Sequence, residues 1–172
     1  MAENGLKMEN DVSVPEKQVV EAPRGRYPGR LDDKGRLKVP TVFQEYFASL
    51  PDKKLYVTSL DRRVAQIYPI QVWRTNEKVF ASYLDDLEAV RNISFNGADL
   101  GAEAEMDSQG RITFNPELRR TLGLEGQELH VWGFPSGRAE IVTEAIYQEQ
   151  LRLSAMQKTA DDLKKLKQAG LQ

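Results

Sequence analysis

Cysteine is absent from the 172 residues, and histidine occurs once, as His130. Disulfide frameworks, thiolate nucleophiles and cysteine-based zinc sites are therefore excluded. The chain has no apolar run near the roughly 20 residues that span a bilayer, and its N-terminus lacks the basic and then apolar pattern of a signal peptide. These absences predict a cytoplasmic protein without a membrane partner. The hydrophobic and charged fractions, 40% and 29%, are typical of soluble globular chains.

Patterns that carry catalysis or cofactor binding are missing as well. No glycine-rich phosphate loop occurs, and no histidine and glutamate stand at metal-ligand spacing. Acidic residues cluster in 85–88 and 103–105, but such runs are usually solvated faces, and nothing places them beside a nucleophile. His130 is expected at the surface or in light packing. We therefore predict no catalytic residue, metal, cofactor or small-molecule substrate, because a hydrolase would need a pocket that the sequence does not show.

Net charge argues against nucleic-acid binding, whereas the distribution of charge argues for it. The formal net charge is −2 and the isoelectric point is about 5.6, while nucleic-acid-binding domains are usually basic. Residues 24–38, however, hold six basic side chains against two acidic ones, and residues 85–107 hold seven acidic side chains against one basic. Residues 1–22 are polar and acidic without periodicity, which predicts a flexible acidic tail. Charge is therefore segregated by segment.

The most informative feature of the chain is a repeat. Residues 31–37, Leu-Asp-Asp-Lys-Gly-Arg-Leu, return 75 positions later as Met-Asp-Ser-Gln-Gly-Arg-Ile at 106–112, and a proline follows each copy. Repetition that continues beyond the motif indicates an internal duplication. We expect a small hydrophobic core in each copy. The predicted units are 24–92 with its core at 26–71, and 93–148 with its core at 101–144, followed by a C-terminal helix and tail at 149–172.

Hydrophobic periodicity predicts the elements of the first unit. Strands at 26–31 and 36–39 are expected to form a hairpin around a turn at 32–35. Thr41 is a candidate N-cap for a short helix. Two more strands follow, and apolar residues from 72 to 87 predict one longer amphipathic helix.

The second unit is expected to repeat this order. A hairpin at 103–114 precedes a helix that Pro116 opens and Gly123 ends. The dipeptide Asn96-Gly97 is a strong turn signal and marks the boundary between the units. A last helix runs from about Thr143 to Met156, and residues 159–172 are expected to be its frayed extension.

Each copy of the motif has the chemistry of a tight turn. An aspartate at the start of such a turn accepts backbone N–H groups, and a glycine supplies a positive φ angle. The arginine that opens the returning strand can then pair its guanidinium with the aspartate. We therefore predict a turn-structuring role for Asp32, Gly35, Asp107 and Gly110.

A tight turn does not require an arginine, so the presence of Arg36 and Arg111 needs a further explanation. Arg36 and Lys38 alternate with Leu37 and Val39, so one face of the predicted strand is basic and the other is apolar. A basic hairpin can contact phosphates and enter a groove wide enough for two strands. Alternating basic residues also protect the edges of sheets, and the residues alone leave both explanations open.

Taken together, the motifs closely resemble the MraZ family. The resemblance covers about residues 24–156 and is carried by Arg24-Gly25, the segment 31–40, Tyr68-Pro69, the segment 103–111 and the segment 116–119. It implies a mixed α+β fold of two tandem swapped-hairpin, AbrB-like β units with flanking helices, assembled into a ring-shaped homo-oligomer. It also implies a nucleoid-associated transcriptional regulator that binds double-stranded DNA at short direct repeats, upstream of the division and cell-wall gene cluster.

The DNA-binding residues implied by this resemblance are Arg24, Lys34, Arg36, Lys38 and Arg111. Gln109 stands where the first copy has Lys34, so we expect the second motif to contribute less to phosphate binding than the first. A different class of function remains as an alternative: a non-catalytic structural or interaction ring, or an antitoxin-like partner whose basic hairpins bind an acidic protein.

Overall fold

The computed structural model describes residues 20–156 and 158–172. The predicted acidic tail therefore lies, except for residues 20–22, outside the described residues. The chain is an α+β protein, as predicted. Its elements in order are β1 (Arg26–Gly29), β2 (Arg36–Lys38), α1 (Thr41–Ser49), β3 (Leu55–Thr58), β4 (Ala65–Pro69), α2 (Ile70–Ser82), α3 (Leu87–Asp99), β5 (Ala102–Ala104), β6 (Arg111–Thr113), α4 (Pro116–Leu122), β7 (Leu129–Gly133), β8 (Ala139–Thr143), α5 (Glu144–Ser154) and α6 (Lys158–Gln168).

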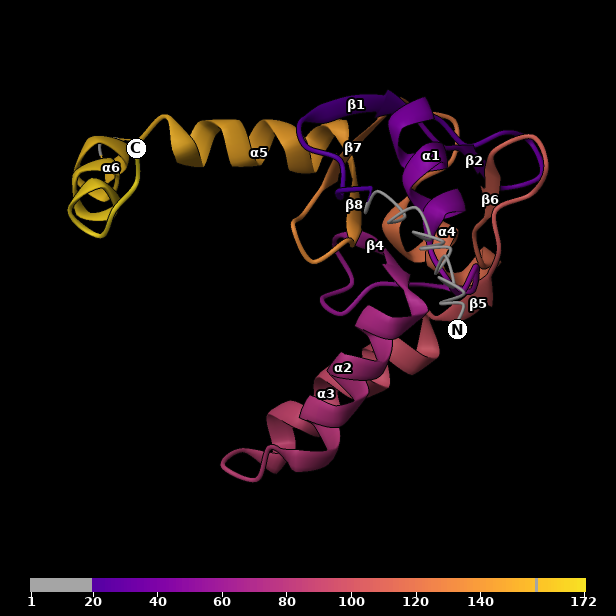
Figure 1. Cartoon of the computed structure of the whole chain (residues 1–172), viewed down its shortest axis with the longest axis horizontal. Coiled ribbons are helices and arrows are strands. Elements are labelled where there is room, and N and C mark those ends of the chain that lie inside the picture. The colour runs from indigo at the N-terminus through magenta and orange to yellow at the C-terminus, as the bar shows by residue number, and fades with distance from the viewer. Residues whose placement is uncertain (1–19, 157) are drawn as a thin grey trace, which may run out of the picture.

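The two repeats exchange strands (Figure 1). One antiparallel sheet has the order β1-β7-β8-β4-β3-β5, and β2 pairs with β6 in a separate two-stranded ribbon. The predicted local hairpins are wrong in their pairing, because only a single bridge, Leu31 to Leu37, joins the two sides of the first turn. Strand β2 has only three residues, and an isolated two-stranded hairpin is at best marginally stable in water. Pairing β2 with its counterpart instead places Leu37 opposite Ile112, and both side chains are fully buried.

The main hydrophobic core is shared by both repeats. Leu37 and Phe43 from the first copy pack in one cluster with Ile112 and Leu118 from the second. The expectation of a separate small core in each copy is therefore wrong, since the exchanged strands interleave the apolar faces. A second, smaller cluster forms where α2 meets β4, and it is centred on Trp73.

Helices α2 and α3 project together from the body, where the sequence predicts one longer helix (Figure 1). Asp86 starts α3 by accepting a hydrogen bond from the Ala89 N–H at 2.9 Å. Asn96 and Gly97 lie inside this helix, so the predicted turn is wrong. The tertiary contacts explain the difference: Asn96 Nδ2 donates to the Leu60 carbonyl at 2.8 Å, and the missing Cβ of Gly97 admits the edge of Trp73.

Side chains cap the N-termini of α3, α4 and α5, whereas α1 and α2 have no side-chain cap. Pro116 occupies the first turn of α4, and Gly123 ends that helix with φ +63°, both as predicted. Thr41 is not an N-cap, because Pro40 holds that position and Thr41 is already helical. Residues 158–168 form the separate helix α6 rather than an extension of α5.

His130 ties α5 to the sheet. It is buried, with 5% of its surface exposed, so the prediction of a surface or lightly packed position is wrong. Its Nδ1 lies 2.8 Å from Arg26 Nη1 and its Nε2 lies 2.5 Å from Glu144 Oε2. Because an arginine can only donate, Nδ1 is the acceptor and Nε2 carries the proton toward the carboxylate. The ring also packs 3.9 Å from that of Tyr147, which explains its burial.

Candidate nucleic-acid interface

The two repeated motifs fold into equivalent turns. In the first, Asp32 Oδ1 accepts from the N–H groups of Lys34 and Arg36 at 3.0 and 2.9 Å. In the second, Asp107 Oδ1 accepts from the N–H groups of Gln109 and Arg111, both at 2.9 Å. A glycine with positive φ completes each turn, +73° at position 35 and +72° at position 110. Each aspartate therefore satisfies two main-chain donors within its own turn.

Each aspartate also fixes an arginine. Asp32 Oδ2 accepts from Arg36 Nε at 2.7 Å, and Asp107 Oδ2 accepts from Arg111 Nε at 2.8 Å. Only 25% and 24% of the two arginine side chains is exposed, less than a freely solvated side chain would show. Within the described residues, the Nη atoms of neither arginine donate a hydrogen bond. The aspartate thus holds each guanidinium by its Nε, while the two Nη groups stay available to an external acceptor.

These contacts lower the pKa of both aspartates below the ordinary value of 3.8. For Asp32 the main cause is the main-chain N–H of Arg36, with the Arg36 side chain and the Lys34 N–H adding to it against the effect of burial. For Asp107, burial acts to raise the pKa, but the N–H and side chain of Arg111 together with the Gln109 N–H outweigh it. Both carboxylates are therefore ionised at neutral pH and keep the arginines paired.

Pairing of β2 with β6 brings the two turns to opposite ends of one ribbon. In its register Arg36 faces Thr113 and Lys38 faces Arg111. Equivalent hydrogen bonds of 2.9 Å close the two ends, from Val39 N to Gly110 O and from Phe114 N to Gly35 O. Because the central Leu37–Ile112 pair is buried, the alternate residues share the opposite face of the ribbon. We call these residues the ribbon face: Arg36, Lys38, Arg111 and Thr113.

Strand exchange also redistributes the charge of the two copies. The Lys38 ammonium donates a hydrogen bond to the main-chain oxygen of Gln109 in the second turn. The second turn lacks a lysine of its own, yet it gains one from the first copy. Two cations therefore accompany each turn, Lys34 and Arg36 at one end, Lys38 and Arg111 at the other. The difference in charge that the sequence predicts between the copies is reduced by the fold.

A helix of the other repeat covers each turn. Arg119 of α4 packs over Gly35 and donates from Nε to the Phe114 carbonyl at 3.1 Å. Gln44 of α1 packs over Gly110 and donates to the Val39 carbonyl at 2.7 Å. Sequence reasoning assigned no role to these two residues. Their separation of 75 positions, the same as that of the motifs, is the signal that could have found them.

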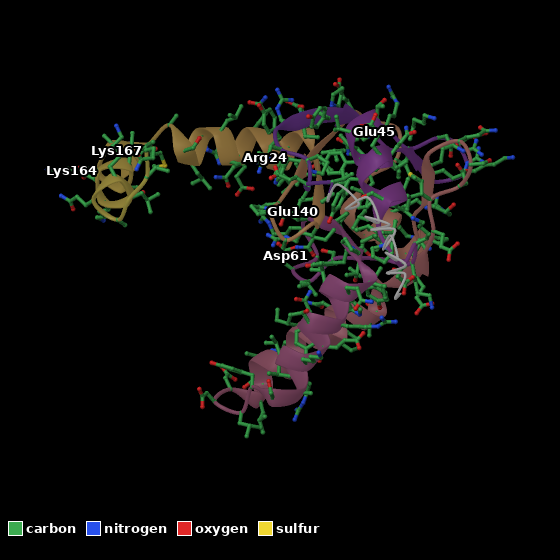
Figure 2. The ribbon with its side chains drawn as sticks, in the orientation of Figure 1. Arg24, Glu45, Asp61, Glu140, Lys164 and Lys167 are labelled. Carbon is green, nitrogen blue, oxygen red and sulfur yellow. The ribbon has the colours of Figure 1, made fainter. Side chains whose placement is uncertain are left out.

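Arg24 lies apart from the ribbon within one chain (Figure 2). It precedes β1, an edge strand of the main sheet, and pairs with Glu21 at 2.7 Å. The remaining predicted DNA-binding residues, by contrast, all lie on the ribbon or its first turn. In the described residues no helix is long and apolar enough to cross a membrane, and no group of potential ligands could hold a metal ion.

Fold and ribbon together define the class: an α+β protein whose two repeats exchange strands to display paired, aspartate-anchored arginines. No family model matches the chain. It is 32% identical over 148 residues to the transcriptional regulator MraZ of Acidobacterium capsulatum, covering 86% of this chain and 99% of that protein. The MraZ proteins of Koribacter versatilis and Thermus thermophilus are 39% and 33% identical, over 64% and 69% of this chain and 76% and 80% of those proteins.

The chain belongs to the MraZ family, since the first of these relatives is matched over nearly its whole length. Those relatives are named as transcriptional regulators. The prediction of a regulator rather than an enzyme is therefore confirmed.

Proposed function

We propose that this regulator binds double-stranded DNA through the ribbon face. The observation that carries the proposal is the pair of aspartate-held guanidiniums, Arg36 and Arg111, whose Nη atoms donate no hydrogen bond within the described residues. A side chain that is already fixed loses little conformational entropy when it binds. A two-stranded ribbon fits the major groove of B-DNA, which is about 12 Å wide.

The four cations are suited to different contacts. Arg36 and Arg111 present rigid forks, which match the O6 and N7 acceptors of guanine. Lys34 and Lys38 are exposed point charges on flexible stems, which suit phosphates. We therefore assign base reading to the arginines and backbone contacts to the lysines.

Self-association into a ring is the second part of the proposal. Large apolar side chains are exposed on α2, α3 and their connection, which holds Leu84 at 75%, and on α5, α6 and their connection, which holds Met156 at 60%. The α2–α3 tip is acidic, with Asp85, Asp86 and Glu88, whereas α6 carries Lys164, Lys165 and Lys167 against Asp161 and Asp162. Figure 2 shows Lys164 and Lys167 on that helix. Complementary patches at different places on one chain favour head-to-tail contacts, which close into rings when the rotation permits.

Assembly into a ring would also compensate for the unfavourable, negative net charge of the chain. With a formal net charge of −2, one copy would bind DNA weakly, but several ribbons on one assembly would engage neighbouring sites at high effective concentration. The resemblance to the family points to short direct repeats upstream of the division and cell-wall gene cluster as the target, and to a place in the cytoplasm on the nucleoid.

The experiment is a fluorescence anisotropy titration with DNA from upstream of the protein's own gene and with a scrambled duplex. The intact protein should prefer the natural duplex, and Arg36→Ala should reduce that affinity by at least about tenfold. Lys78→Ala, which removes an exposed cation from α2, is the matched control and should bind as the intact protein does. Equal affinity for both duplexes would contradict the proposal and favour the acidic-protein alternative.

The ring is tested separately by sedimentation equilibrium with Leu84→Asp. This variant should lower the oligomer mass and weaken binding to DNA with several repeats, while binding to a single repeat changes little. Tight binding of a monomeric variant to the multi-repeat DNA would refute the dependence on assembly.

A further inference from the structure

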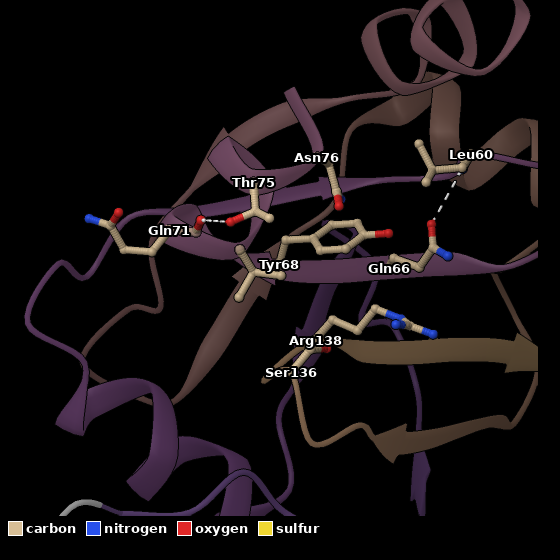
Figure 3. Close-up of a pocket in the computed structure, with 9 residues that line it drawn as sticks. Leu60, Gln66, Tyr68, Gln71, Thr75, Asn76, Ser136 and Arg138 are labelled. Carbon is tan, nitrogen blue, oxygen red and sulfur yellow. Dashed lines mark hydrogen bonds between the residues drawn. The ribbon is translucent and has the colours of Figure 1, made fainter. Parts of the chain in front are cut away.

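A pocket of about 710 Å³ lies outside the ribbon, where β4 and α2 meet the turn between β7 and β8 (Figure 3). Its volume falls in the range of roughly 300–1,000 Å³ that is usual for small-molecule sites. Its lining includes Leu60, Gln66, Tyr68, Asn76, Ser136 and Arg138. None of these residues belongs to β2 or β6, and the regulator's proposed DNA contacts leave the pocket unused.

Arg138 is the one charged residue in this lining, and its hydrogen bonding is incomplete. Its Nε is buried and has no hydrogen-bond partner among the described residues. Nη2 donates to Glu140 Oε1 at 3.3 Å, and the guanidinium packs 3.8 Å from the ring centroid of Phe134. The aromatic ring fixes the plane of the guanidinium, and the glutamate uses only one of its donors. A buried, unpaired N–H of a charged group is unfavourable, and the partly exposed guanidinium keeps donors that could bind an acceptor.

The neighbouring polar groups are also arranged as donors. Gln66 Oε1 accepts from the Leu60 N–H at 3.3 Å, which leaves the amide nitrogen of Gln66 to donate. Burial raises the pKa of Tyr68, so its hydroxyl stays protonated at neutral pH. Figure 3 shows the Tyr68 hydroxyl and the Arg138 guanidinium extending in the same direction as the Gln66 amide.

We propose that this pocket binds a small organic oxyanion, a carboxylate or a phosphate monoester. The oxyanion would accept from the Arg138 guanidinium, the Tyr68 hydroxyl and the Gln66 amide, and the carbon skeleton would contact Leu60 and Val72. The hydrogen-bond donors that remain free, together with the positive charge of Arg138, favour an anion over a cation or a neutral ligand. The pocket is thereby a candidate effector site, separate from the DNA contacts.

The test is an NMR titration of the full chain that follows the Nε–H signal of Arg138. Benzoate and phenyl phosphate serve as the two oxyanion probes, and benzamide serves as the neutral analogue. Benzoate, phenyl phosphate or both should shift the signal saturably, whereas benzamide should not. Arg138→Gln should weaken binding at least about tenfold, and Tyr68→Phe, which keeps the ring, should weaken it severalfold. Arg74→Gln, on α2 but outside the lining, is the control for charge and should bind normally.

Each outcome bears on the proposal. Saturation by only one of the two anions supports it and identifies the source of the oxyanion. Binding of benzamide as tight as that of benzoate, unchanged binding by folded Arg138→Gln, or no saturation by either anion up to roughly 10 mM would overturn it. If Arg138→Gln fails to fold, the signal of the intact protein and the Tyr68→Phe variant still decide.

Discussion

The Lys38 ammonium donates to the main-chain oxygen of Gln109, a residue 71 positions further along the chain and in the other repeat. This bond exists because β2 pairs with β6 rather than with β1. It carries a basic side chain of the first copy to the turn of the second. The ribbon and its turns therefore carry two cations at each end, Lys34 and Arg36 at the first turn and Lys38 and Arg111 at the second.

Lys38→Ala should weaken DNA binding mainly through its electrostatic part. If Lys38 contacts one phosphate, the slope of log K against log salt should become less negative by about one. The preference for natural over scrambled DNA should change little. Anisotropy titrations at several salt concentrations measure both quantities. An unchanged slope would mean that Lys38 serves only the Gln109 turn.

Asp32→Ala should destabilise the fold more than Arg36→Ala does. The aspartate accepts three hydrogen bonds, two of them from main-chain N–H groups, whereas the arginine side chain contributes one of the three. Thermal denaturation followed by circular dichroism should therefore give the lower Tm for Asp32→Ala. Equal Tm values would contradict these roles.

The anchored aspartates should make stability fall in acid. Both carboxyls have a pKa lowered from 3.8 in the folded protein. Their stabilisation is therefore present above about pH 3.8 and is lost as the pH falls through the lowered folded values. Between about pH 5 and pH 2, Tm should drop more steeply for the intact protein than for the double variant Asp32→Asn, Asp107→Asn. Parallel curves would show that other groups govern acid unfolding.

Gly35→Ala should be more harmful than its backbone angle alone explains. A Cβ at Gly35 would lie 2.3 Å from Arg119 Cζ, and moving Arg119 would break its bond to the Phe114 carbonyl. Gly123 has a similar φ, +63°, with open space around it, so Gly123→Ala isolates the backbone strain of about 1–2 kcal/mol. Urea denaturation should show a larger loss for Gly35→Ala.

A double-mutant cycle separates the two effects at Gly35. In an Arg119→Ala background, the loss caused by Gly35→Ala should shrink to that of Gly123→Ala. An excess that persists in this background would locate the clash elsewhere.

Gly97→Ala should lower stability although it lies within a helix. At an exposed helical site the change would gain up to about 1 kcal/mol. Here the added Cβ would lie 2.9 Å from the Trp73 ring and 3.2 Å from Leu60. Asn92→Ala, at an exposed position of the same helix, is the control and should raise the urea midpoint slightly. A rise for Gly97→Ala of the same size would refute the packing argument.

Much of the local structure was predictable because its causes lie within a few residues. The Asp32 turn, the proline at the start of α4 and the Gly123 C-cap each depend on contacts no more than five positions apart. The same reasoning failed at Asn96-Gly97, where local turn propensity competes with packing against Trp73. It also failed at His130, since the side chains that bury the ring come from β1 and α5.

By itself, the sequence determined the duplication, the two turns and the identity of the basic residues, because each is a matter of composition, order and short-range chemistry. Only the tertiary structure decided which strands pair, that one core serves both repeats, and that Lys38 accompanies the second turn. An alternating apolar pattern specifies which face of a strand is buried but not which partner covers it. That choice depends on the whole chain, since the exchanged pairing buries Leu37 against Ile112.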